Sequence, residues 1–111
     1  MEKIIETCWN ELWPLINVLN EICHGINISN LEQVVGFKYD TILALLTKLE
    51  TYDVKEIDSD NKTILKLDES EKEIIKNCFR IIFKEIEEWE FSTRIGISTH
   101  EANALKNKFL E

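Results

Sequence analysis

SNLEQVVGFKYDTILALLTKLE, residues 29–50, is the stretch that decides the expected fold. Ser29 and Glu32 have the spacing of a capping box, in which the serine covers an open amide at a helix start and the glutamate reaches back to the amide of the serine. The short helix that they open ends at Gly36, and a second amphipathic helix is predicted over residues 39–50. Helix, tight turn with a glycine, and helix together form a helix-turn-helix arrangement.

The segment after this arrangement, residues 53–67, predicts a β-hairpin. Two short runs containing β-branched residues flank Asp58-Ser59-Asp60-Asn61, a cluster of turn-forming residues. A hairpin at this place corresponds to the wing of a winged-helix domain. Residues 1–67 are therefore expected to form a helix-turn-helix with a wing-like hairpin.

The segment before it, residues 2–23, predicts a helix. Because proline lacks a backbone donor and clashes with the preceding turn, Pro14 is expected to kink this helix or to divide it into two. The apolar residues recur at steps of three and four and share one broad face; they are Ile5, Cys8, Trp9, Leu12, Ile16, Leu19 and Cys23.

Two further capping boxes predict the helices of the C-terminal part, residues 68–111. Asp68 with Glu71 opens a long helix that is expected to reach about Glu88. Ser98 with Glu101 opens a final helix near the end of the chain. The fold class that follows is mainly α with one β-hairpin, a winged helix-turn-helix-like domain with additional C-terminal helices.

Length and composition favour one small domain that works inside the cell. The chain has 111 residues without a Pro/Gly/Ser-rich linker, so residues 1–111 are expected to form a single domain. The N-terminus lacks the basic start of a signal peptide, and no apolar run approaches the roughly 20 residues that cross a bilayer. Three cysteines without a Cys-x-x-Cys pair fit reduced thiols in the cytoplasm. We expect a cytoplasmic protein with no membrane partner.

No motif for catalysis, cofactor binding or metal binding is present in the sequence. Zinc sites normally draw two ligands from a short Cys-x₂₋₄-Cys or His-x₃₋₅-His element, and none occurs here. The chain also lacks a glycine-rich phosphate loop, a nucleophile elbow and a His-Glu-x-x-His motif. We expect no enzyme, no cofactor and no metal.

Charge argues against nucleic acid as the partner. The formal net charge is −8, and affinity for nucleic acid comes largely from neutralising phosphates with basic side chains. The expected recognition helix offers Lys38 and Lys48, but Asp40 and Glu50 cancel them. A protein with a basic surface is the expected partner instead.

The glutamate-rich segment at the end of the predicted long helix is the candidate site. Glu85, Glu87, Glu88 and Glu90 surround Trp89. The simpler interpretation is a solvated helix face, with Trp89 and Phe91 folded into the core. The functional interpretation is a negative rim around an aromatic anchor, which is typical of a protein-binding hot spot.

A weak internal echo links the two halves of the chain. Val35-Gly36-Phe37, followed by Ala44-Leu45 and Lys48, recurs sixty positions later as Ile95-Gly96-Ile97, followed by Ala104-Leu105 and Lys108. We interpret it as a shared turn-then-helix pattern in preference to a duplication.

One resemblance makes the expected function more concrete. The tail over residues 67–109, in particular Trp89-Glu90-Phe91-Ser92-Thr93-Arg94-Ile95-Gly96-Ile97-Ser98, resembles the tail of small bacterial proteins, some of which are similar to immunity proteins of polymorphic or contact-dependent toxin systems. The resemblance implies an acidic protein that neutralises a cognate toxin by one-to-one binding. The expected function is a protein-binding inhibitor or adaptor, and the alternative is a winged-helix DNA-binding transcription regulator.

Overall fold

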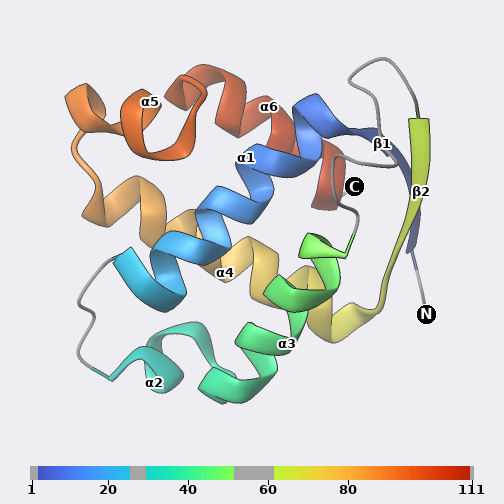
Figure 1. Ribbon diagram of the computed structural model, residues 1–111. Coiled ribbons are helices and arrows are strands. Elements are labelled where there is room, and N and C mark those ends of the chain that lie inside the picture. The colour runs from blue at the N-terminus through green and yellow to red at the C-terminus, as the bar shows by residue number, and fades with distance from the viewer. Residues whose placement is uncertain (1–2, 26–29, 52–61, 111) are drawn as a thin grey trace.

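The computed structural model describes residues 3–25, 30–51 and 62–110. Within these ranges the chain is mainly α, with one two-stranded antiparallel sheet, and it is compact, with a radius of gyration of 13.2 Å. The elements in chain order are β1 Lys3–Cys8, α1 Trp9–Asn20, the π-helical turn η1 Glu21–Gly25, α2 Leu31–Val35, α3 Tyr39–Glu50, β2 Lys62–Leu67, α4 Glu69–Glu85, α5 Glu88–Ile95 and α6 Thr99–Leu110 (Figure 1).

The prediction of a helix from residue 2 was wrong for its first part, because residues 3–8 form the strand β1. Ile5 and Thr7 are buried and Ile4 and Glu6 are exposed, which is the alternation of a strand with one buried face. β-Branched residues favour this conformation, and β2 supplies the hydrogen-bonding partner. Because that partner is distant in sequence, the local helical spacing did not reveal it.

The second arm of the predicted hairpin is the strand β2, which pairs with β1 in the described residues, in the order β1-β2. The register runs from Lys3 opposite Leu67 to Cys8 opposite Lys62. The first arm of the predicted hairpin and its turn, residues 53–61, lie outside the described residues. The sheet packs at one side of the helices, at the right in Figure 1.

The helix α1 continues through Pro14, where a kink or two helices were expected. Pro14 is buried in the core, so its ring contributes to packing. Asn10, the residue whose carbonyl loses its helical donor at Pro14, lies in an exposed position.

The predicted order of short helix, glycine turn and second helix is confirmed over α2 and α3. Gly36 ends α2 with a φ of 87°, a left-handed conformation that favours glycine. Within the described residues Asn30 is the N-cap of α2, and Oε2 of Glu32, the second member of the first predicted capping box, accepts a hydrogen bond from the amide of Tyr39 at 2.8 Å. Ser29 lies outside the described residues.

The other two capping boxes are confirmed. The Asp68 side chain accepts from the amide of Glu71 at 2.7 Å, and the Glu71 side chain accepts from the amide of Asp68 at 2.9 Å. Ser98 and Glu101 make the same reciprocal pair at the start of α6, at 3.1 and 3.2 Å.

The predicted long helix to residue 88 was wrong at its end, because α4 stops at Glu85 and α5 begins at Glu88. In a straight helix, residues eight apart lie about 12 Å apart along the axis. The break instead lets Phe91 of α5 stack on Phe83 of α4, with ring centroids 5.4 Å apart and planes within 2°. Ile86 is extended at the break, and its side chain is only 4% exposed, so the turn itself packs into the core.

The helices α1 and α4 form the centre of the molecule and are in contact with each other. In Figure 1, α2 and α3 lie on one side of this pair and α5 and α6 on the other. Apolar residues from all the α-helices and from the inner face of the sheet form one continuous core. Among the described residues, no helix is long and apolar enough to span a membrane.

Candidate functional site

The five predicted site residues lie together where α4 turns into α5. We name Glu85, Glu87, Glu88, Trp89 and Glu90 the acidic corner. Glu85 is the last residue of α4, Glu87 is the N-cap of α5, and the other three form the first turn of α5. The structure therefore brings the predicted residues together, but on two elements and not on one helix face.

Trp89 is the most exposed large apolar residue among those described, at 74%, and the interpretation that placed it in the core was wrong. The same interpretation was right for Phe91, which is 1% exposed. The indole Nε1 of Trp89 donates a hydrogen bond to Oε2 of Glu87 at 3.0 Å. The indole ring is therefore exposed to solvent, while its N–H group already has a hydrogen-bond acceptor in the protein.

Glu85 keeps the predicted place at a helix C-terminus, as the last residue of α4, but the other glutamates of the acidic corner stand in a different electrostatic setting from the predicted one. They were expected at a helix C-terminus, where they would oppose the helix dipole. Glu88 and Glu90 lie instead in the first turn of α5, where negative side chains are stabilised by the positive end of the dipole. Glu88 and Glu90 therefore fit the local fold without an electrostatic penalty from α5.

The four carboxylates differ in whether they form hydrogen bonds or ion pairs with described residues. Glu87 accepts from Trp89, and Glu90 forms an ion pair with Arg94 at 3.6 Å. Glu85 and Glu88 are exposed and have no hydrogen bond or ion pair to any described residue. These two charges are the ones most available to an external partner.

Arg94 belongs to the site and was not singled out from the sequence as a site residue. It joins α5 to η1, because its guanidinium forms an ion pair with Glu21 and donates to the carbonyl oxygen of Gly25 at 3.3 Å. A shallow hollow beside the exposed indole is lined by Trp89, Glu90, Thr93 and Arg94. The spacing of four residues between Glu90 and Arg94 on a helix is the signal that could have identified the pair.

The three cysteines are free thiols. Burial raises the pKa of Cys78 to about 12, and the neighbouring Cys23 adds to the shift. Burial also raises the pKa of Cys23, with a further contribution from the charge of Glu50. Raised pKa values keep both groups protonated, which is the opposite of what a nucleophilic or metal-binding thiol needs.

The described residues contain no group of three or more His, Cys, Asp or Glu side chains placed to hold a metal ion. His24 and His100 are both exposed, at the end of η1 and in the first turn of α6.

No model of a protein family matches the chain, and no curated protein and no solved structure matches it.

Proposed function

We propose that the protein is a cytoplasmic protein-binding inhibitor or adaptor, and that its most concrete form is an immunity-type protein that neutralises a cognate toxin by stoichiometric binding. The acidic corner is the proposed contact surface. The observation that carries the proposal is the 74% exposure of Trp89 within a rim of glutamates. Tryptophan is enriched at the energetic centres of protein interfaces, where it is surrounded by a polar rim.

The proposed partner has a basic surface. The formal net charge of −8 attracts basic proteins at long range. At short range, Glu85 and Glu88 offer carboxylates that no described residue occupies, while Trp89 offers a ring face that a cationic side chain can cover. Electrostatic complementarity of this kind speeds association and selects the partner.

A winged-helix transcription regulator is the second candidate, favoured by the helix-turn-helix order of α2 and α3. Its electrostatic support is weak. Nζ of Lys48 lies 2.8 Å from Oε2 of Glu71, so this base on the candidate recognition helix is already paired. Lys38 is the N-cap of α3, and Asp40 follows two residues later in the first turn of the same helix.

The test is capture of a partner from the native host with tagged full-length protein, compared with the variant Glu85→Lys/Glu88→Lys. We expect wild type to retain one basic partner in stoichiometric amount and the variant to retain at least tenfold less. The immunity form adds that the captured partner is toxic when expressed alone and harmless when expressed together with this protein.

The matched control is Asp40→Lys/Glu73→Lys, which changes the net charge equally at two exposed positions outside the acidic corner. Asp40 lies in the first turn of α3, as Glu88 does in α5, so both variants lose one favourable contact with a helix dipole. Thermal melts should show all three proteins folded. Equal capture by wild type and both variants would remove the acidic corner from the proposal.

A further inference from the structure

The two halves of the chain contain the same elements at a constant offset of sixty residues. The helix α1 with η1 covers residues 9–25, and α4 covers residues 69–85. The helix α3 covers residues 39–50, and α6 covers residues 99–110. The short helices α2 and α5 end at Val35 and Ile95, and each is followed by a glycine with positive φ, Gly36 at 87° and Gly96 at 98°.

The strands follow the same offset to within one residue, β1 at residues 3–8 and β2 at residues 62–67. Their register is reciprocal, because Lys3 lies opposite Leu67 and Thr7 lies opposite Thr63. Thr63 is the residue sixty positions after Lys3, and Leu67 is the residue sixty positions after Thr7. An antiparallel pair of this kind maps onto itself when the two halves are exchanged.

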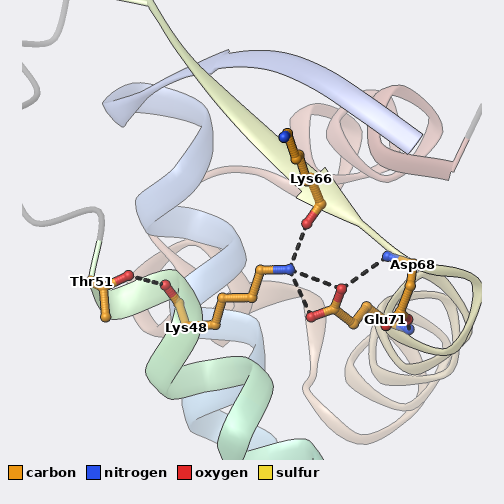
Figure 2. A network of polar contacts seen from close by, with 5 residues as sticks. All are labelled: Lys48, Thr51, Lys66, Asp68 and Glu71. Atoms are coloured by element: carbon orange, nitrogen blue, oxygen red, sulfur yellow. Dashed lines mark hydrogen bonds and ion pairs between the residues drawn. The ribbon is translucent and has the colours of Figure 1, made fainter. Parts of the chain in front are cut away.

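The ion pairs between the halves are also reciprocal. Lys48 of α3 contacts Glu71 of α4 at 2.8 Å, and Lys108 of α6 contacts Glu11 of α1 at 2.5 Å. Lys108 is the sixtieth residue after Lys48, and Glu71 is the sixtieth residue after Glu11. Figure 2 shows the first of the two pairs, in which Lys48 also donates to the backbone carbonyl oxygen of Lys66.

A second pair of polar contacts repeats the pattern. The side-chain amide of Asn77 donates to the carbonyl oxygen of Val35 at 2.8 Å, and that of Asn17 donates to the carbonyl oxygen of Ile95 at 2.9 Å. Both carbonyls belong to the residue just before a left-handed glycine. Both asparagines lie on the central helix of the opposite half.

The core obeys the same relation. Buried residues sixty positions apart occupy corresponding places in the two halves, and nine such pairs are Ile5/Leu65, Leu15/Ile75, Val18/Cys78, Leu19/Phe79, Ile22/Ile82, Val35/Ile95, Ile42/Ala102, Leu45/Leu105 and Leu49/Phe109. The helix contacts match as well, because α1 packs on α3 and α5 while α4 packs on α6 and α2.

We infer that the protein is two copies of one β-α-α-α unit, fused in a single chain and packed about a pseudo-twofold axis that passes between β1 and β2. In an isologous twofold interface, every contact between two residues occurs twice, the second time with the roles of the two halves exchanged. The interface between the halves is therefore a dimer surface, and the partner that each half fits is a second copy of the same unit. The sequence echo reflects duplication, and the interpretation as a shared local pattern is replaced.

The sequences of the two halves differ at the acidic corner, because the residues sixty positions before its five members are Gly25, Asn27, Ile28, Ser29 and Asn30. Trp13 marks a second difference, because a Cβ at Gly96 would lie 2.1 Å from its ring, while Gly36 has open space and the counterpart of Trp13 is Glu73.

The test is a full-length tandem chain in which the sequence of residues 62–110 replaces residues 2–50, with residues 51–61 kept as the connection. We expect a monomer that unfolds cooperatively and gives one set of amide NMR signals for both halves, about half the number of wild type. Light scattering checks that the monomer has not exchanged halves with another chain.

The first tandem chain has no Trp13, because Glu73 takes its place. A second tandem chain, with residues 2–50 in place of residues 62–110, controls for this loss, since a copy of Trp13 then stands against each of the two glycines. Either tandem chain reaching a folded, symmetric monomer supports the inference. Two tandem chains that both stay unfolded, or that fold with two unequal sets of signals, would overturn it. These readouts do not involve a partner, so they stand or fall apart from the proposed function.

Discussion

At the scale of single residues, Trp89 and Phe91 give opposite predictions although they are two positions apart. Phe91→Ala should lower the free energy of unfolding by about 3–5 kcal/mol, because it removes a buried ring that stacks on Phe83. Trp89→Ala should change it by no more than about 0.5 kcal/mol, because the ring is 74% exposed. Urea unfolding measures both. A loss with Trp89→Ala as large as with Phe91→Ala would mean that the indole is part of the core.

Cys78 makes stability depend on pH in the alkaline range. Burial raises the pKa of Cys78 from the ordinary 9.0 to about 12 in the folded protein. Between these values the folded state keeps a proton that the unfolded state loses, so the free energy of unfolding should fall as pH rises above 9 and be insensitive to this group below 9. The contribution to the slope is at most about 1.4 kcal/mol per pH unit.

Denaturant unfolding between pH 8 and 10.5 measures that slope in wild type, Cys78→Ala and the control Cys8→Ala. The Cys78 variant should lose stability at every pH but show a shallower decline than the other two proteins. Parallel curves for all three would contradict a buried, protonated Cys78.

At the scale of elements, the two glycine turns form a matched pair. Gly36→Ala and Gly96→Ala both place a side chain at positive φ, at a cost of about 1–2 kcal/mol. Only Gly96→Ala also drives a methyl group into the ring of Trp13, which should add about 1–3 kcal/mol of overpacking. Thermal unfolding should therefore rank wild type above Gly36→Ala and Gly36→Ala above Gly96→Ala. Equal losses for the two variants would argue against the Trp13 contact.

The elements that sequence could predict are those specified by local chemistry. The capping boxes at Asp68 and Ser98 fix two helix starts because each box satisfies its own open amides within four residues. The strand β1 and the end of α4 could not be predicted in this way. The first depends on β2 as a distant partner, and the second on the stacking of Phe91 against Phe83. The residues of the acidic corner were found by composition, but their exposure follows from that same break and was beyond local reasoning.

At the scale of the whole molecule, charge predicts the response to nucleic acid. With a formal net charge of −8 and Lys48 paired to Glu71, duplex DNA should bind no more tightly than the weak non-specific range, with a Kd of about 10⁻⁴ M. Fluorescence polarisation with random and mixed-sequence duplexes at physiological salt measures this. Submicromolar binding that weakens steeply with added salt would favour the regulator instead.

The pairing of β1 with β2 also has a consequence during synthesis on the ribosome. The strand β1 emerges well before the strand that completes its hydrogen bonds, residues 62–67. At about 5–20 residues per second, β1 waits several seconds without its partner. Its exposed edge, including Ile4 and Ile5, is then open to other nascent chains or to chaperones. During co-translational folding this sheet can therefore close only after β2 has emerged, and its closure attaches β1 to the half of the chain that follows.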